Sequence, residues 1–321
     1  MKLTRGITRK TTGKTITGTS PRTAPVLGLA CAALATVVWS GSFVTSRALH
    51  DSVPPVQHAF WRWVIALVAV APFGARRAWR QRALFRRHAG YVLLASLLGV
   101  AVYNTLVNQA GLTTPAASMG TIMAASPVLM ALFERLGGVR LGARRTTGLL
   151  TACAGVVLLM GGGAGFGAGD LWMLAASCCF AGYSALLRRR PAELGGTAFL
   201  FTTFLVGTVL LLPVQAVSLA VQGGFRPTPG TLLPLLYVGV ASSAVAFFAW
   251  NKSIALIGAA RAGAVYYLQP VCVALLSWAL LGEATGPRQL LCMALILGGV
   301  MLGAGSGRRR CRDLFSLFSR R

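Results

Sequence analysis

The sequence has few charged residues and very few acidic ones. Only 12% of the 321 residues are charged, and 6 are Asp or Glu. That share is about half of the roughly 25% typical of soluble domains. Hydrophobic residues make up 55% of the chain, more apolar surface than a soluble fold of this length can bury. The composition excludes an ordinary cytosolic enzyme, a disordered protein and a secreted disulfide scaffold.

Residues suited to catalysis or metal binding are also scarce. The histidines, His50, His58 and His88, fall in loops or at the edges of apolar segments. The 7 cysteines are spread along the chain without zinc-ligand spacing and are interpreted as small hydrophobic residues. No nucleophile with a base and no carboxylate pair occurs inside an apolar segment. The sequence therefore predicts no enzyme activity, no metal and no cofactor, and an intramembrane enzyme is kept only as an alternative.

Long apolar segments dominate the chain. A helix needs about 20 mostly apolar residues to cross a bilayer. The sequence contains ten such segments, and the polar gaps between them are too short for the buried helices of a soluble protein. We therefore predict an all-α polytopic membrane protein with ten transmembrane helices. They are predicted at residues 24–46, 56–73, 89–110, 116–133, 147–163, 169–187, 195–221, 231–251, 259–281 and 289–305.

The 31 Lys and Arg residues indicate how these helices are oriented. An even number of spans places both termini on one side of the membrane. If that side is the cytoplasm, all basic residues except Arg47, Arg62, Arg226 and Arg288 fall in inner loops or tails. Such an asymmetry is typical of the positive-inside rule. We therefore predict cytoplasmic termini, contact with membrane lipids and no nucleic-acid partner, because no nucleic-acid motif accompanies the charge.

The two ends of the chain are basic and lack apolar segments. Residues 1–23 contain no apolar run of the kind found in a cleavable signal peptide, and we expect them to form a disordered basic tail. Residues 306–321 are predicted to form a second basic cytoplasmic tail. The segments between the tails belong to two repeats, predicted at 24–163 and 169–305.

An internal repeat relates the two halves. A shift of 143 residues aligns the third to fifth segments with the eighth to tenth. The shift pairs Asn108 with Asn251, Gly120 with Gly263, Pro127 with Pro270, and Gly155 with Gly298. Each half holds an odd number of segments, so the second half enters the membrane inverted. Inverted five-helix repeats are typical of transporters whose substrate site lies near the midplane, where the halves meet.

These features together resemble the drug/metabolite transporter superfamily, EamA type, over about residues 25–305. The residues that carry the resemblance are Trp39-Ser40-Gly41-Ser42-Phe43, Arg62, Pro127, Pro270 and Leu281-Gly282-Glu283. One departure is that Val139-Arg140 stand where the first half would repeat Gly282-Glu283. The resemblance implies export or exchange of a small metabolite, amino acid or drug across a bacterial inner membrane by alternating access.

Polar and aromatic side chains within the apolar segments are the candidates for a substrate pathway, because polar groups avoid lipid. The candidates are Trp39, Arg62, Tyr103, Asn108, Tyr183, Asn251, Tyr266, Tyr267 and Gln269, with Pro127 and Pro270 as expected helix kinks. A kink at Pro270 would free a carbonyl for a ligand. The asparagines either bind substrate or brace neighbouring helices, and Trp39 either contacts substrate or packs against other aromatic rings.

Arg62 is the strongest single candidate because it is charged and lies within a span. No acidic residue lies deep in any span to neutralise it. Backbone carbonyls, water or an anionic substrate carboxylate remain as partners, and its position near the outer end also permits snorkelling. A structural or gating role and direct substrate contact both stay open, as do proton coupling and exchange.

Other functions are compatible with the same scaffold. In a lipid or polyprenyl-carrier flippase, Arg62 would meet a phosphate group. A regulatory membrane protein would transport nothing. The predicted partners are membrane lipids and a small-molecule substrate, and the protein is expected to be a monomer or a homodimer.

Overall fold

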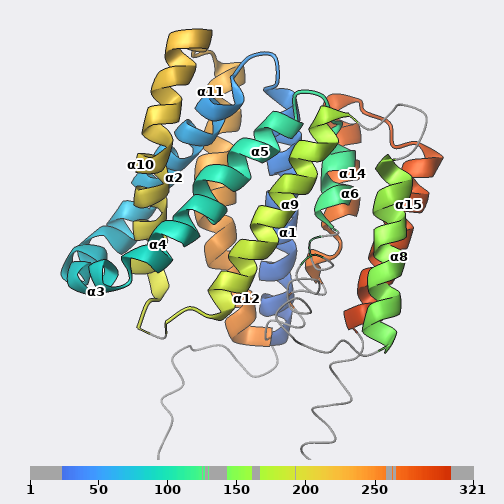
Figure 1. Cartoon of the computed structure of the whole chain (residues 1–321), viewed down its shortest axis with the longest axis horizontal. Helices are drawn as coiled ribbons and strands as arrows, with labels where there is room; N and C mark the ends of the chain where they lie inside the picture. The colour runs from blue at the N-terminus through green and yellow to red at the C-terminus, as the bar shows by residue number, and fades with distance from the viewer. Residues whose placement is uncertain are drawn as a thin grey trace, which may run out of the picture.

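The structure, a computed structural model, describes residues 24–124, 126, 129, 143–160, 167–191, 193–257, 262 and 265–304, and all regular secondary structure within them is helical (Figure 1). The first half contains α1 (Ala24–Ala48), α2 (Pro55–Arg80), α3 (Arg82–Arg87), α4 (Ala89–Ser96), η1 (Leu97–Val102), α5 (Tyr103–Ala110), α6 (Ala116–Met123) and α8 (Ala143–Met160). The second half contains α9 (Ala168–Arg188), α10 (Gly196–Gln222), α11 (Pro229–Leu236), η2 (Tyr237–Val245), α12 (Ala246–Ile257), α14 (Gln269–Leu281) and α15 (Pro287–Ala304).

Six helical spans in the described part of the chain are long and apolar enough to cross a membrane. They are Ala24–Ala48, Pro55–Arg80, Ala89–Ala110, Ala168–Leu187, Gly196–Gln222 and Pro229–Ser253. Large apolar side chains such as Val68, Leu233 and Trp278 are exposed on these helices and on α14. An apolar outer surface of this extent fits contact with lipid. The protein is therefore a multi-pass membrane protein.

Two of these spans contain a π-helix. Residues 89–110 run continuously through α4, η1 and α5, and α11 continues through η2 into α12. Both η1 (Leu97–Val102) and η2 (Tyr237–Val245) are π-helical. Shifting η1 by the 143-residue repeat places it on 240–245, inside η2. The same local distortion thus occurs at matching positions of the two halves.

The predicted ninth segment is interrupted in the structure. Tyr267 and Leu268 form a turn, and α14 begins only at Gln269. Pro270 therefore lies in the first turn of a helix, which differs from the mid-helix kink expected from the sequence. A proline is favourable there because the first turn has no partner for its missing N–H. Pro127, the other expected kink, lies outside the described residues.

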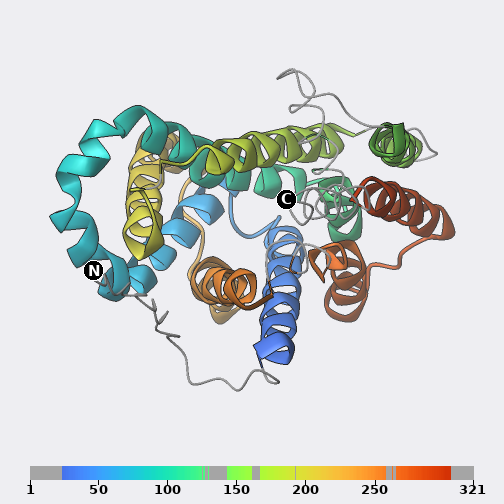
Figure 2. The same ribbon diagram turned by 90° about the horizontal axis from the view of Figure 1, so that it is seen from below.

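Helices pack largely against their counterparts from the other half. Helix α2 packs against α10, α6 against α14, and α8 against α15. Figure 2 shows α8 and α15 side by side at one edge of the bundle, away from α2 and α10. Helix α1 of the first half packs against α12 of the second half. The equivalent contact with the halves exchanged is that of α9, from the second half, with α5, from the first half. In Figure 1 the stretch from α4 to α5 runs opposite to the stretch from α11 to α12.

Basic residues gather at one end of the bundle. Helix α3, the carboxyl ends of α2, α9 and α12, and the amino end of α8 all lie toward the lower end in Figure 1. These segments carry Arg76, Arg77, Arg80, Arg82, Arg86, Arg87, Arg144, Arg189 and Lys252. The carboxyl ends of α1, α5 and α14 lie at the opposite end.

Candidate substrate site between the two halves

Arg62 reaches from α2 to the π-helix η2 of the other half. Arg62 is buried, with only 8% of its surface exposed. Nε donates to Ser243 Oγ at 3.1 Å, and Nη2 donates to Ser242 Oγ at 3.2 Å. The ion pairs among the described residues do not involve Arg62. The partners of the buried guanidinium are therefore neutral hydroxyl groups, which the sequence did not predict.

The π-helical geometry of η2 brings two consecutive serines to one guanidinium. The Ser243 hydroxyl donates to the carbonyl oxygen of Val238, five residues earlier, at 2.8 Å. A π-turn holds one more residue than an α-turn and is frequently found at functional sites. The widened turn lets Ser242 and Ser243 each accept from a different nitrogen of Arg62.

Helix α1 completes this site from the opposite side. Ser42 Oγ and Ser242 Oγ lie 2.6 Å apart, and Trp39 Nε1 donates to the Ser242 carbonyl at 3.0 Å. We call Trp39, Ser42, Arg62, Ser242 and Ser243 the Arg62 cluster. The cluster joins two helices of the first half to η2 of the second half, so it lies where the two halves meet.

Aromatic rings border the Arg62 cluster. The Trp39 ring centroid lies 5.7 Å from that of Phe247, 5.4 Å from that of Trp250 and 5.9 Å from that of Tyr266. Arg62 Cζ lies 5.5 Å from the ring centroid of Trp63, within the range of a cation–π interaction. The cluster thus contacts aromatic rings through Trp39 and through Arg62.

Several other polar groups lie close to the cluster. Tyr103 of α5 and Tyr237 of η2 are near enough for the guanidinium charge to act on their hydroxyl groups. The Ser40 hydroxyl donates to the Gln269 carbonyl at 3.3 Å, and the Tyr266 ring packs against Trp39 of the cluster. The structure therefore brings together five residues predicted from the sequence. They are Trp39, Arg62, Tyr103, Tyr266 and Gln269.

His58 lies one helical turn before Arg62. It is 2% exposed, and its Nε2 has no hydrogen-bond partner among the described residues. The sequence places His58 at the edge of a span, and it is not among the predicted site residues. Its ring is instead buried beside the only cationic group of the cluster.

The remaining predicted residues lie elsewhere. Asn108 donates to the Pro55 carbonyl at 3.2 Å and accepts from Ser46 Oγ at 2.7 Å, so it braces α1, α2 and α5. Asn251, its counterpart in the repeat, is exposed on α12. Tyr183 packs against the backbone of η1 at Gly99, and Tyr267 is half-buried in the turn before α14. Pro127 lies outside the described residues.

Sequence reasoning missed the residues of η2 that form half of the site. Single hydroxyl groups are common in transmembrane helices and carry little signal, so Ser242, Ser243 and Tyr237 are not among the residues predicted from the sequence. The Tyr237 hydroxyl donates to the Val38 carbonyl at 2.6 Å and adds another link between α1 and η2. Two adjacent serines in an otherwise apolar segment were the available signal.

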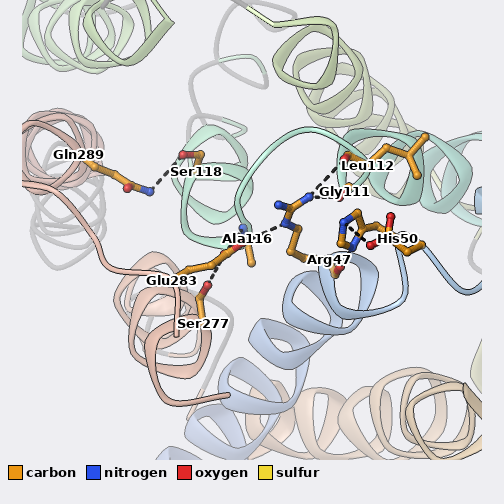
Figure 3. Close-up of polar contacts among 10 residues, drawn as sticks. Arg47, His50, Gly111, Leu112, Ala116, Ser118, Ser277, Glu283 and Gln289 are labelled. Carbon is orange, nitrogen blue, oxygen red and sulfur yellow. Dashed lines mark hydrogen bonds and ion pairs between the residues drawn. The ribbon is translucent and has the colours of Figure 1, made fainter. Parts of the chain in front are cut away.

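A second polar network lies at the end of the bundle opposite the basic residues (Figure 3). Arg47 Nε donates to Glu283 Oε1 at 2.9 Å, and its Nη1 donates to the Gly111 and Leu112 carbonyls at 3.2 Å each. Glu283 Oε2 accepts from Ser277 Oγ at 2.6 Å and from the Ala116 N–H at 3.1 Å. The network links the carboxyl ends of α1 and α14 to the loop that leads into α6.

The backbone at Gly282 positions this glutamate. Gly282 has a φ of 67°, the left-handed conformation that ends many helices and favours glycine. Partial burial raises the pKa of Glu283. Hydrogen bonds from Ser277, Arg47 and the Ala116 N–H, together with the charge of Arg47, outweigh that effect and hold the pKa below its usual range. The carboxylate is therefore ionised at neutral pH.

The chain is similar to known transporter proteins over most of its length. The sequence profile of the "EamA-like transporter family" matches the chain twice, at residues 26–161 and 167–304. A Streptantibioticus cattleyicolor protein named "Probable terminal-alkyne amino-acid exporter" is 29% identical over 86% of this chain and 94% of its own length. Bacillus subtilis "Uncharacterized transporter YdfC" is 25% identical over 82% of this chain and 86% of its own length.

Two further comparisons agree with these. Escherichia coli K12 "Uncharacterized inner membrane transporter YedA" is 24% identical over 83% of this chain and 87% of its own length. A crystal structure 23% identical in sequence matches 90% of this chain and 99% of its own chain with a TM-score of 0.60. This likeness shows that the fold is shared.

Proposed function

Because the chain belongs to the EamA-like transporter family, we propose that it exports or exchanges a small metabolite across the bacterial inner membrane by alternating access. The names of its relatives support this proposal, since one is named as an amino-acid exporter and another as an inner membrane transporter. An amino acid or a similar small molecule is therefore the first substrate class to test.

We propose that ten transmembrane helices form two inverted five-helix repeats. Three observations support this architecture. The family pattern matches both halves, the π-helices η1 and η2 occur at matching positions, and equivalent stretches run in opposite directions (Figure 1). Helix pairs such as α2 with α10 and α8 with α15 join counterparts, as a two-fold relation between halves requires. Such a relation makes inward-open and outward-open states similar in energy.

The observation that carries the function is the hydrogen bonding of Arg62 to Ser242 and Ser243. It places a buried cation on the surface where the first half meets the second. In inverted-repeat transporters the substrate binds at this surface, near the membrane midplane. Movement of one half against the other would separate α2 from η2 and open the Arg62 cluster to one side of the membrane and then to the other.

The basic end of the bundle supports an orientation with the cytoplasm on that side. Arginine-rich loops are retained on the cytoplasmic side of bacterial membranes. The end that carries Arg47 and Glu283 would then face the periplasm. Reporter fusions at residue 82 and at the carboxyl terminus test this orientation, and both are expected to report a cytoplasmic location. A periplasmic signal from either fusion contradicts it.

Reconstitution tests the proposed transport. Proteoliposomes that hold the full chain and a mixture of amino acids and small organic acids are expected to release selected solutes faster than protein-free liposomes, as measured by mass spectrometry of the exterior. The Ser242→Ala/Ser243→Ala double variant removes both hydroxyl partners of Arg62 and is expected to slow this release. Ser52→Ala, in an exposed loop, is the matched control and is expected to behave as the wild type. Equal release from liposomes with and without protein contradicts the proposal.

A further inference from the structure

We propose that the Arg62 cluster binds the carboxylate group of the transported molecule and that the neighbouring aromatic rings bind its apolar part. The inference rests on the proposed transport function and adds a substrate class to it. That class is small monocarboxylates with an apolar body, which includes amino acids with apolar side chains.

Arg62 forms no ion pair with an acidic side chain among the described residues. Arg62 is 8% exposed and lies among helices whose outer surface is apolar. Its two side-chain hydrogen bonds go to serine hydroxyls, which carry no charge. In the described part of the chain, the acidic groups that form ion pairs are Asp51 and Glu283, and their partners are His50 and Arg47. A buried guanidinium without a protein carboxylate is a favourable partner for the carboxylate of a ligand.

The donor groups of the Arg62 cluster also suit a carboxylate in their geometry. A guanidinium presents its N–H groups in a planar fork that matches a carboxylate, and such charged pairs form stronger hydrogen bonds than neutral ones. The Ser243 hydroxyl already donates to the Val238 carbonyl, so the hydroxyl groups that can still offer a hydrogen to an anion are those of Ser42 and Ser242. Ser42 and Ser242 share one hydrogen bond at 2.6 Å, which uses the hydrogen of one hydroxyl and leaves the hydrogen of the other. The carboxylate would therefore receive hydrogen bonds from the cation and from one serine hydroxyl.

The number of cations favours a carboxylate over a phosphate. Arg62 is the only Lys or Arg side chain of the Arg62 cluster, and the groups bonded to it are neutral. A phosphate monoester carries close to two negative charges at neutral pH. One guanidinium balances a single negative charge and would leave a phosphate group partly unbalanced in apolar surroundings.

The aromatic rings provide a surface for the rest of the ligand. Trp39 belongs to the cluster and also contacts Trp250 and Tyr266 at ring centroid distances of 5.4 and 5.9 Å. Trp250 and Tyr266 contact each other at 5.8 Å. Rings grouped in this way bind apolar groups through a large contact area, and their faces also attract an ammonium group. The carboxylate site and the apolar surface therefore share Trp39.

A binding experiment on the purified full chain tests the inference. The probes are 3-phenylpropionate, 3-phenylpropanol and 3-phenylpropylamine, which share one apolar body and differ in charge. Binding is followed by tryptophan fluorescence and by the shift in melting temperature. The carboxylate is expected to bind about tenfold or more tightly than the alcohol, the size expected for hydrogen bonds to a charged group. Arg62→Gln is expected to remove that preference, and Arg226→Gln, the same change in an exposed loop, is expected to keep it.

Further measurements keep the test decisive. Retained binding of 3-phenylpropanol by Arg62→Gln shows that the variant is folded. Equal affinity of the wild type for the carboxylate and the alcohol overturns the inference, as does an unchanged preference in Arg62→Gln. Tighter binding of phenyl phosphate than of 3-phenylpropionate also overturns it and favours a phosphate-bearing substrate. If proteoliposomes transport neutral solutes while the carboxylate preference is absent, the proposed function stands and only the substrate class fails.

Discussion

The Arg47 guanidinium and the Glu283 carboxylate lie 2.9 Å apart, although 236 residues separate them in the chain. Arg47 lies in the last turn of α1, and Glu283 follows α14, so the pair joins the two halves at one end of the bundle. Each partner also bonds the backbone that leads into α6, through the Gly111 and Leu112 carbonyls and the Ala116 N–H. Removing one charge therefore weakens contacts among three segments.

We predict that Glu283→Gln lowers the melting temperature at neutral pH and that the loss depends on pH. The pKa of Glu283 in the folded protein lies below its ordinary value of 4.5. A lowered pKa means that the ionised carboxylate stabilises the folded state fully above about pH 5, and that this stabilisation is lost as the pH falls through the folded pKa. The difference in melting temperature between wild type and Glu283→Gln is therefore expected to be largest near pH 7 and to shrink below pH 4.5.

Glu193→Gln is the matched control for this prediction. Glu193 is exposed in the loop before α10. The same substitution there is expected to leave the melting curve unchanged both near pH 7 and below pH 4.5. A pH-independent difference between wild type and Glu283→Gln would show that the side chain acts through its shape and not through its charge.

We predict unequal effects of one substitution at two positions that the repeat makes equivalent. Asn108→Ala removes two buried hydrogen bonds, the one accepted from Ser46 Oγ and the one donated to the Pro55 carbonyl, while Ser46 keeps its bond to the Ser42 carbonyl. The expected loss in the free energy of unfolding is about 1–3 kcal/mol. Asn251→Ala removes an exposed side chain and is expected to change stability by less than about 0.5 kcal/mol. Thermal unfolding of the two variants in the same detergent measures the difference.

A large effect of Asn251→Ala on transport but not on stability would place Asn251 in the substrate pathway. An equal loss of stability in both variants would contradict the asymmetry that the structure shows. The two asparagines therefore also test how far the repeat extends from the backbone to the side chains.

The long spans could be predicted from the sequence because the bilayer imposes a simple length and composition on each helix. The predicted span 89–110 has the same bounds as α4, η1 and α5 together. Its π-helix could not be predicted, since one shifted set of backbone hydrogen bonds changes neither length nor composition. The turn before Gln269 was also missed, because a proline in an apolar run fits both a kink and a helix start.

The importance of Arg62 could be predicted, but its partners could not. A charge inside an apolar segment is conspicuous on its own. Ser242 and Ser243 lie 180 and 181 residues after Arg62 in the chain. They become significant only when η2 packs against α2. Asn108 and Asn251 illustrate the same limit. They match in the repeat, yet packing buries one and exposes the other.

Trp63 offers a test of the contact between α2 and the first π-helix. Its Nε1 donates to the Val100 carbonyl of η1 at 2.9 Å, and its ring packs on Phe204 at 4.6 Å. Trp63→Phe keeps an aromatic ring but leaves this carbonyl without its donor. We expect a loss of about 1 kcal/mol in the free energy of unfolding. Trp61→Phe, two residues earlier and 41% exposed, is expected to have no measurable effect, and an equal loss in both variants would exclude the hydrogen bond as the cause.

Helix η2 packs closely on α2 at Gly239. A Cβ atom at Gly239 would lie 2.6 Å from Ile65 Cβ and 3.2 Å from the Arg62 carbonyl oxygen. Ile65 Cβ is fixed to the backbone, so Gly239→Ala forces the two helices apart, at an expected cost of about 1–3 kcal/mol. The same displacement lengthens the bonds from Arg62 to Ser242 and Ser243, so binding of 3-phenylpropionate is expected to weaken together with stability. Gly298→Ala is the control, because a Cβ there meets no atom within 4 Å among the described residues. It is expected to keep both properties, and a Gly239→Ala variant that binds and unfolds as the wild type does would show that the contact between α2 and η2 is looser than the structure indicates.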